Sequence, residues 1–261
     1  MASSVALISG ATGAIGSAIS DGLARLGWRV ILLGRNKERL ERLYDDLSKR
    51  FPNAEVGFEL CDVTVPSSIQ DLVARWTGPL HVLINNAAVA PSRRTLSIEG
   101  LEVQFATNIL GYVRLQHAFA DILTASAPAR VVNVASYWAG DLDMDDLQFH
   151  KRTYDNHVAY RQSKQANRML SRAFADLWVD RGVVVNSCHP GDVRSRLSTD
   201  LGFGGHESAS KAAATPLFLA ADPDTANVTG QYFEDGRAVA CRFSFDPRRN
   251  FELLSVCQNF L

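Results

Sequence analysis

Cysteine is scarce and scattered in this sequence of 261 residues. Its four cysteines show neither a CxxC pair nor the spacing of a metal site: Cys61, Cys188, Cys241 and Cys257. This usage predicts reduced thiols in a reducing compartment and no bound metal.

An excess of charge of either sign is also absent, as are long apolar runs. The formal net charge is −1, which argues against binding to nucleic acid or to an anionic membrane surface. No apolar run approaches the ~20 residues that a membrane-spanning helix needs. Residues 1–4 lead directly into an apolar strand, which leaves no room for a signal peptide. We therefore expect a soluble, cytoplasmic protein without a membrane anchor.

The chain contains no internal repeat, low-complexity tract or linker, so we expect one domain over residues 1–261. Short runs rich in β-branched residues alternate with longer helical stretches. Apolar strands are expected at 5–9, 30–33, 56–60, 82–85, 131–135 and 183–188, with a short last strand at 231–233. Continuous apolar strands separated by helices predict a parallel sheet that is covered on both faces. The expected fold is a single-domain α/β Rossmann fold with a doubly wound sheet of about seven strands.

Two segments lack a regular pattern. Residues 140–156 are first acidic and then basic, and residues 195–207 are rich in glycine and polar side chains. Both are predicted to be loops, and the second is a candidate lid over a binding site.

A glycine-rich turn lies between the first strand and the first helix. A dinucleotide site requires this context, because glycines let the backbone approach a pyrophosphate at a helix N-terminus. The predicted cofactor-binding residues of this turn are Gly10, Thr12, Gly13, Ala14, Ile15 and Gly16.

The end of the second strand bears on the choice of cofactor. An acidic residue there would bind the ribose 2′-hydroxyl, whereas an arginine accommodates a 2′-phosphate. This chain has Arg35 and Asn36 and no carboxylate, which favours NADP(H) over NAD(H). After the third strand, Asp62 could accept a hydrogen bond from the adenine amino group or cap a helix.

Tyr160 and Lys164 are one helical turn apart and therefore share a helix face. A nearby cation favours the phenolate, which would lower a pKa that starts near ~10 and make Tyr160 an acid or base near neutrality. A surface pair is the alternative for this spacing alone. Ser136, which closes a buried strand upstream, and the glycine-rich turn favour a catalytic pair.

Together these residues resemble the short-chain dehydrogenase/reductase family over nearly the whole chain. The motifs follow the family's order: the glycine turn, Cys61-Asp62-Val63, Asn85-Asn86-Ala87-Ala88, Asn108, Ser136, Tyr160 with Lys164, and Pro190-Gly191. The stretches 159–167 and 189–195 are similar to its retinol-dehydrogenase-like branch. The glycine spacing at 10, 13 and 16 is instead typical of a longer, epimerase-like branch.

The resemblance implies roles for individual residues. Tyr160 would exchange a proton with the substrate oxygen, Lys164 would lower its pKa and bind the nicotinamide ribose, Ser136 would polarise the substrate oxygen, and Asn108 would hold a relay water. Further cofactor contacts are expected from Val63, Asn86, Ala87, Pro190, Gly191, Val193 and Ser195.

The resulting hypothesis is an NADP(H)-dependent oxidoreductase that interconverts a carbonyl and an alcohol on a small hydrophobic substrate. The alternatives are an epimerase- or dehydratase-like enzyme and a non-catalytic NADP(H)-sensing protein. Whether the chain is a monomer or a homodimer stays open, because the residues preceding Tyr160 could obstruct the helices through which the family commonly pairs.

Overall fold

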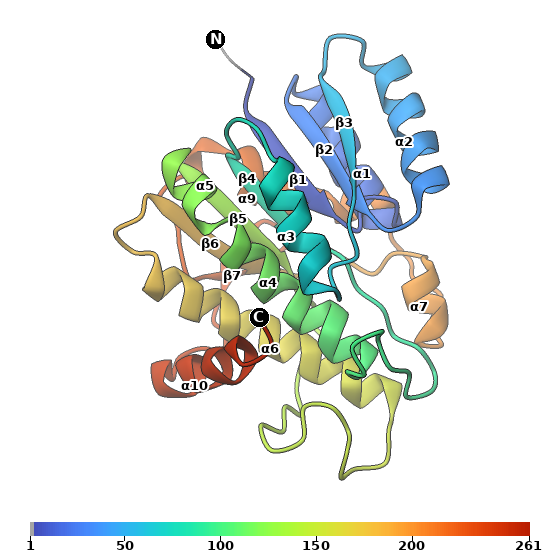
Figure 1. The fold of residues 1–261 in the computed structure, drawn as a ribbon, viewed down its shortest axis with the longest axis vertical. Coiled ribbons are helices and arrows are strands. Elements are labelled where there is room, and N and C mark those ends of the chain that lie inside the picture. Colours follow the sequence, from blue (N-terminus) through green and yellow to red (C-terminus); the bar gives the residue numbers. More distant parts are fainter. Residues whose placement is uncertain (1–2) are drawn as a thin grey trace.

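The computed structural model describes residues 3–261, and its strands form one eight-stranded sheet (Figure 1). The strand order is β3-β2-β1-β4-β5-β6-β7-β8, and all neighbours run parallel except β7 and β8. The strands are β1 (Val5–Ser9), β2 (Arg29–Gly34), β3 (Val56–Leu60), β4 (Val82–Asn85), β5 (Ala129–Val134), β6 (Val183–Cys188), β7 (Tyr232–Glu234) and β8 (Arg237–Val239).

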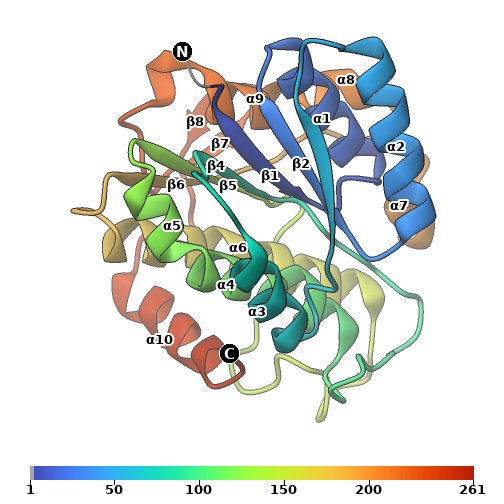
Figure 2. The same ribbon diagram turned by 45° about the horizontal axis from the view of Figure 1, so that its top comes forward.

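Helices cover both faces of the sheet (Figure 2). Leu7 and Ile8 are neighbours on β1 but belong to opposite cores, because successive side chains of a strand point to opposite faces. Helices α1, α2 and α9 pack on the Ile8 side, and α3, α4, α6 and α10 pack on the Leu7 side. The helices are α1 (Ala14–Arg25), α2 (Lys37–Arg50), α3 (Pro66–Arg75), η1 (Phe105–Leu110), α4 (Gly111–Ala118), α5 (Ala120–Ala125), α6 (Asn156–Leu177), α7 (Arg196–Asp200), α8 (Ala209–Ala212), α9 (Ala214–Ala221), η2 (Pro223–Thr225) and α10 (Pro247–Gln258).

The position of a binding site follows from the strand order. The chain moves outward from β1 through β2 to β3, and then crosses to β4 on the other side of β1. At such a switch point the connections diverge and leave a crevice at the carboxyl ends of β1 and β4.

The predicted doubly wound α/β fold is confirmed, and β1–β7 correspond to the seven expected strands. The additional strand β8 is an exposed edge strand that follows β7 through a tight hairpin. Asp235 and Gly236 both have positive φ, 46° and 71°, as a type I′ hairpin turn requires at its two central residues. Because β8 is three residues long and buries no side chain, it carries no apolar pattern.

The irregular segment before α6 contains no helix or strand from 136 to 155 and forms the loop at the bottom of Figure 1. The Asp146 carboxylate organises it by accepting hydrogen bonds from the backbone N–H groups of His150, Lys151 and Arg152. Burial raises the pKa of Asp146, but these N–H groups and the Arg152 guanidinium outweigh it and lower the pKa to about 2.

The second irregular segment contains the short helix α7, so the prediction of a loop throughout 195–207 was wrong in part. Ser195 and Ser198 form a reciprocal capping box at its start. The ends of the segment are tied together, since the Asp192 carbonyl accepts hydrogen bonds from the N–H groups of His206 and Glu207, both at 2.8 Å. The segment is therefore a loop whose two ends lie side by side.

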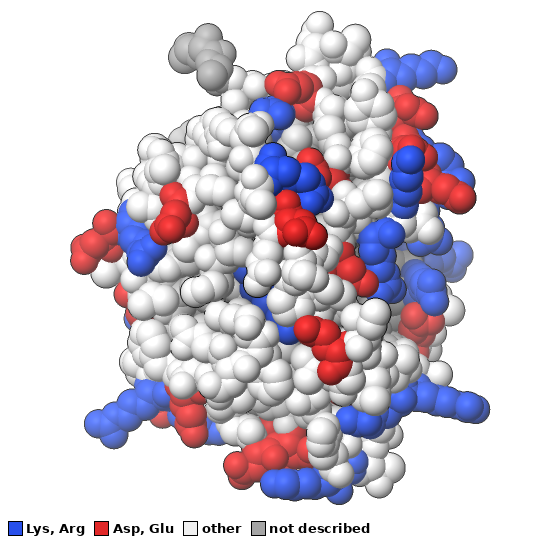
Figure 3. All heavy atoms as spheres, in the orientation of Figure 1, with Lys and Arg blue, Asp and Glu red and all other residues white. Residues whose placement is uncertain are grey.

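Figure 3 shows Lys and Arg interspersed with Asp and Glu on the face that carries α10. Across residues 3–261, no helix combines the length and apolar character needed to cross a membrane.

Candidate active site

Two positions of the turn after β1 have no room for any side chain larger than that of glycine. Gly10 has φ +64°, and a Cβ atom there would lie 2.7 Å from Ala87 Cα. A Cβ atom on Gly16 would overlap the Gly10 carbonyl oxygen and lie 2.8 Å from Asn86 Nδ2. Asn86 closes the turn by donating to the carbonyls of Ser9 and Gly10 at 3.0 and 3.1 Å. The result is a tight cradle at the N-terminus of α1.

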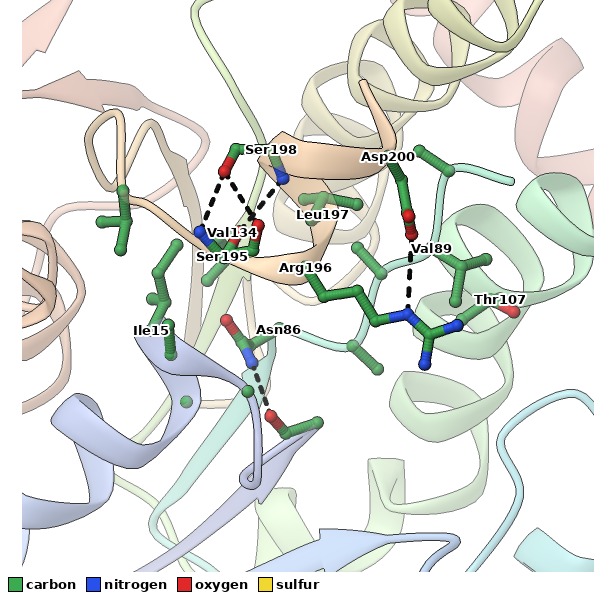
Figure 4. A pocket seen from close by; sticks show the side chains of 18 of the residues that line it. Ile15, Asn86, Val89, Thr107, Val134, Ser195, Arg196, Leu197, Ser198 and Asp200 are labelled. Atoms are coloured by element: carbon green, nitrogen blue, oxygen red, sulfur yellow. Dashed lines mark hydrogen bonds and ion pairs between the residues drawn. The ribbon is translucent and has the colours of Figure 1, made fainter. Parts of the chain in front are cut away.

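One cavity of about 1220 Å³ extends from this cradle to Tyr160. Its size exceeds the ~300–1,000 Å³ that is usual for one small ligand, so it has room for a dinucleotide and a substrate. Every predicted cofactor residue lines it: Gly10, Thr12, Gly13, Ala14, Ile15, Gly16, Arg35, Asn36, Asp62, Val63, Asn86, Ala87, Tyr160, Lys164, Pro190, Gly191, Val193 and Ser195. Figure 4 shows Ser195, the N-cap of α7, with Leu197 and Ser198 of that helix on one side of this cavity and Ile15 and Asn86 on the other.

The predicted catalytic residues Ser136, Tyr160 and Lys164 line the inner end of the same cavity. Helix α6 carries Tyr160 and Lys164, and Ser136 lies just beyond β5. The Lys164 ammonium donates to the Val134 carbonyl at 2.9 Å and lies 5.5 Å from the centre of the Tyr160 ring. The Ser136 hydroxyl oxygen accepts a hydrogen bond from the Trp138 N–H at 3.1 Å.

Burial decides the protonation of this pair. Burial raises the pKa of Tyr160 well above its ordinary value, and hydrogen bonding to Ser136 only partly opposes this effect. Burial also lowers the pKa of Lys164 to about 7. The pKa of Tyr160 is therefore shifted opposite to the direction expected from the spacing, because loss of water disfavours the phenolate. That Lys164 lowers this pKa stays a prediction.

Asn108 is the one predicted site residue that does not line the cavity. Its amide bridges two segments: it exchanges hydrogen bonds with the backbone of Val89 at 2.9 and 3.0 Å and donates to Ser163 Oγ at 3.1 Å. Asn108 lies in the π-helical turn η1, a rare geometry that is frequent at functional sites. This amide fixes the loop after β4 against α6, and its part in a proton relay stays a prediction.

The outer end of the cavity is basic. Arg35 lines it together with Arg39 and Arg42 of α2, and Arg35 lies 3.9 Å from Asp62. Asn36 also caps α2 by accepting a hydrogen bond from the Arg39 N–H at 2.9 Å. Sequence reasoning missed Arg39 and Arg42, although their spacing from Arg35 could have placed all three on one side of the helix start.

Asp62 has a structural role in addition to its place in the cavity wall. Its carboxylate accepts hydrogen bonds from the Thr64 N–H and hydroxyl at 2.9 and 2.7 Å. Asp62 does not cap a helix, because its partner Thr64 precedes Val65, the N-cap of α3. Its hydrogen bond to an adenine amino group stays a prediction.

Aromatic and apolar side chains surround the catalytic end. Trp138 makes edge contacts with Phe203, at a centroid distance of 5.3 Å, and a tilted contact with Tyr160 at 6.0 Å. Leu197 and Leu201, within and just after α7, pack into the same cluster. The segment predicted as a lid thus packs against Tyr160 and Trp138.

Comparison with known proteins agrees with this geometry. Residues 4–202 match the family model described as short chain dehydrogenase. The chain belongs to the short-chain dehydrogenase/reductase family. It is 32% identical to human retinol dehydrogenase 13 over 249 residues, which cover 87% of this chain and 75% of that protein. Human polyprenol dehydrogenase is 33% identical over 252 residues, covering 87% and 76%. These relatives place the chain in the retinol-dehydrogenase-like branch.

A solved structure shows the same fold. A short-chain dehydrogenase of Burkholderia cenocepacia in complex with NADP superposes with a TM-score of 0.71 at 21% identity, covering 88% of this chain and 95% of that one. Membership of this family makes the protein an oxidoreductase that acts on CH–OH or carbonyl groups. The glycine spacing of the epimerase-like branch does not mark a different chemistry here.

Proposed function

We propose that the protein is an NADP(H)-dependent reductase of hydrophobic aldehydes or ketones, with residues 1–261 acting as one dinucleotide-binding oxidoreductase domain. One observation carries the proposal. A single cavity joins three arginines at its outer end to Ser136, Tyr160 and Lys164 at its inner end.

The arginines support the choice of cofactor. Arginine is permanently charged and presents a rigid fork of donors that matches a phosphate. Asp62, the carboxylate nearest to Arg35, already accepts two hydrogen bonds from Thr64. A 2′-phosphate at this end would face three arginines against two aspartates, Asp46 and Asp62, and therefore more cationic than anionic groups.

The cradle fits the rest of a dinucleotide. Gly10 and Gly16 keep Cβ atoms out of the space beside α1, and the helix N-terminus offers unpaired N–H groups to a pyrophosphate. Pro190, Gly191 and Val193 line the cavity beyond β6, beside the catalytic end. When bound there, a nicotinamide cofactor supplies or accepts hydride.

Tyr160 is in the protonation state that reduction requires. Its raised pKa keeps the phenol protonated at neutral pH, so it can donate a proton to a carbonyl oxygen as that oxygen gains negative charge. The Ser136 hydroxyl is a second donor at the same end of the cavity and would stabilise that charge. Lys164 is held in place by the Val134 carbonyl and lies beneath the tyrosine ring. Oxidation of an alcohol needs the phenolate instead and is less favoured at neutral pH.

The surroundings of Tyr160 support a hydrophobic substrate. Trp138 and Phe203 line the cavity with Leu197 and Leu201, and burial of such surfaces favours apolar ligands. The names of the two human relatives refer to retinol and polyprenol, which are both isoprenoid alcohols. A cytoplasmic location and the choice between monomer and homodimer stay predictions from the sequence.

NADPH absorbance with a panel of aliphatic, aromatic and isoprenoid aldehydes and ketones tests this function. We expect the wild-type protein to consume NADPH with apolar members of the panel and Tyr160→Phe to bind NADPH without turnover. Tyr44→Phe is the matched control, because Tyr44 lies on α2 outside the cavity. Full activity of Tyr160→Phe would refute the mechanism, and no NADPH consumption by the wild type across the panel would refute the function.

A further inference from the structure

Helix α6 carries a buried arginine, Arg168, on the same face as Tyr160 and Lys164. Arg168 follows Lys164 by one more helical turn, so the three residues lie along one face. Lys164 donates to the Val134 carbonyl, and Arg168 Nη2 donates to the Ser136 carbonyl. Successive turns of α6 thus hold two alternate carbonyls, those of Val134 and Ser136, where the chain leaves β5.

A charge at this place is energetically unfavourable unless it is well compensated. Arg168 is only 7% exposed, and burying a guanidinium removes it from water at a cost of several kcal/mol. Its Cζ atom lies 3.5 Å from the centre of the Tyr232 ring and 5.5 Å from that of Phe243, and Nη2 lies 4.0 Å from Glu234. An apolar side chain would fill such a position without losing hydration. An apolar residue could make neither the ion pair with Glu234 nor the hydrogen bond to Ser136, and only the second of these reaches the active site.

Ser136 needs this support because it lies beyond the sheet. The pairing of β5 with β6 ends at Val134 and Cys188, and the Ala135 N–H makes the last bond to β6. In the described part of the chain, Arg168 is the only hydrogen-bond donor to the Ser136 carbonyl. The hydroxyl oxygen is held separately by the Trp138 N–H.

We infer that Arg168 is a positioning residue: it fixes the Ser136 peptide so that the serine hydroxyl points to the substrate oxygen. The stack on Tyr232 and Phe243 sets the plane of the guanidinium and links the C-terminal segment to the active site. This inference rests on the proposed role of Ser136 in carbonyl polarisation. Arg168 does not line the cavity, so it acts through Ser136 and not on the substrate.

A double-mutant cycle on kcat tests the inference. Ser136→Ala is expected to lower kcat by about a hundredfold, as for loss of one donor to a developing oxyanion. Arg168→Met should lower kcat by roughly tenfold when Ser136 is present and by less than about twofold in the Ser136→Ala background, because only coupled residues lose additivity. The KM for NADPH should stay within about twofold of wild type, since the cofactor is bound elsewhere. Arg168→Lys keeps a charged donor and should retain more of kcat than Arg168→Met.

Arg172→Met is the matched control. Arg172 occupies the next turn of α6 and pairs with Asp176 at 2.9 Å, outside the cavity. It should leave kcat unchanged in both backgrounds. Equal effects of Arg168→Met with and without Ser136 would overturn the inference and leave Arg168 a purely structural residue.

Two further measurements keep the test decisive. If Arg168→Met loses NADPH binding, the same cycle with Arg168→Lys applies, and its deficit must again vanish without Ser136. If the wild type reduces no carbonyl, that result counts against the proposed function, and crystal structures of wild type and Arg168→Met, which lacks the donor, then decide the positioning. A displaced Ser136 peptide in the variant supports the inference, and an unmoved one overturns it.

Discussion

Removal of the arginines at the outer end of the cavity should change the choice of cofactor. Arg35 follows β2 and Arg39 lies in the first turn of α2, and both line the cavity. A hydrogen bond to a charged group contributes about 1.5–3 kcal/mol. The Arg35 side chain is 64% exposed and pairs only loosely with Asp62 at 3.9 Å, so the lower end of that range applies. A loss of about 1.4 kcal/mol is a tenfold change in an equilibrium constant.

We therefore expect Arg35→Ala and Arg39→Ala each to raise the KM for NADPH by roughly tenfold, and the double variant by up to about a hundredfold if the two act independently. The KM for NADH should change by less than about twofold, because NADH has no 2′-phosphate. Initial rates with both cofactors, measured at low and moderate salt, give these values. The ratio of the two KM values should approach one as ionic strength rises, since exposed charges are screened.

The control is Arg25→Ala, which removes an exposed arginine of α1 that pairs with Asp21 outside the cavity. It should leave both KM values unchanged. Equal increases for NADPH and NADH in Arg35→Ala and Arg39→Ala would refute recognition of the 2′-phosphate and would assign these arginines to a shared part of the two cofactors.

Three further predictions follow from other parts of the molecule. Gly16→Ala should abolish NADPH binding, measured by fluorescence titration, because its Cβ overlaps the Gly10 carbonyl; tight binding would contradict the cradle. Asp146→Asn should reduce the free energy of unfolding, measured by urea denaturation at pH 7, by about 2–4 kcal/mol, because its hydrogen bonds to the backbone of 150–152 become weaker. The exposed Asp145→Asn should not change it. Equal unfolding midpoints for Asp146→Asn and wild type would show that the carboxylate does not organise this loop. Lys164→Met should raise the melting temperature at pH 6 while abolishing turnover, and a lower melting temperature would show that the buried ammonium stabilises the fold.

The sign of the lysine effect follows from its lowered pKa. Between about pH 7 and the ordinary pKa near ~10.4, the unfolded chain binds a proton that the folded chain has lost, so Lys164 makes stability rise with pH in this window. Below pH 7 both states are charged, and the full cost of burying the ammonium is present. Methionine removes that cost, which is why stabilisation is expected at pH 6.

The sequence predicted the fold and the cavity wall well because both depend on local patterns. Apolar strands separated by helices specify a parallel sheet, and motifs that end successive parallel strands meet at one edge. The glycine turn, Arg35, Asp62, Asn86 and Pro190 therefore came together as predicted. Strand β8 and helix α7 were missed, since each is too short to show a periodic pattern.

Contacts between distant residues were beyond the sequence. Arg168 has no motif of its own, and its importance appears only when β7 and the segment after β8 bring Tyr232 and Phe243 around it. Asn108 was predicted to hold a relay water, which stays a prediction, whereas the hydrogen bonds of its amide with Val89 and Ser163 were not foreseen. The role of such a side chain depends on which distant residue forms a hydrogen bond with it, and the spacing of residues along the sequence does not predict that partner.

The Tyr160–Lys164 pair shows how burial can reverse an argument from spacing. Two groups four residues apart on a helix are close enough for the cation to favour the phenolate. This holds only while both groups stay hydrated, because burial disfavours the charged form of each. Here both are buried, so the phenol is held protonated and the ammonium loses its proton near neutrality. The same pair is then better suited to giving a proton to a carbonyl than to taking one from an alcohol. Alcohol oxidation should consequently accelerate only as the pH rises beyond the ordinary tyrosine pKa near ~10, where phenolate begins to form, while carbonyl reduction should show no such rise. Measured pH profiles in both directions decide this, and a reduction rate that climbs with pH in parallel with oxidation would show that Tyr160 is not the proton donor.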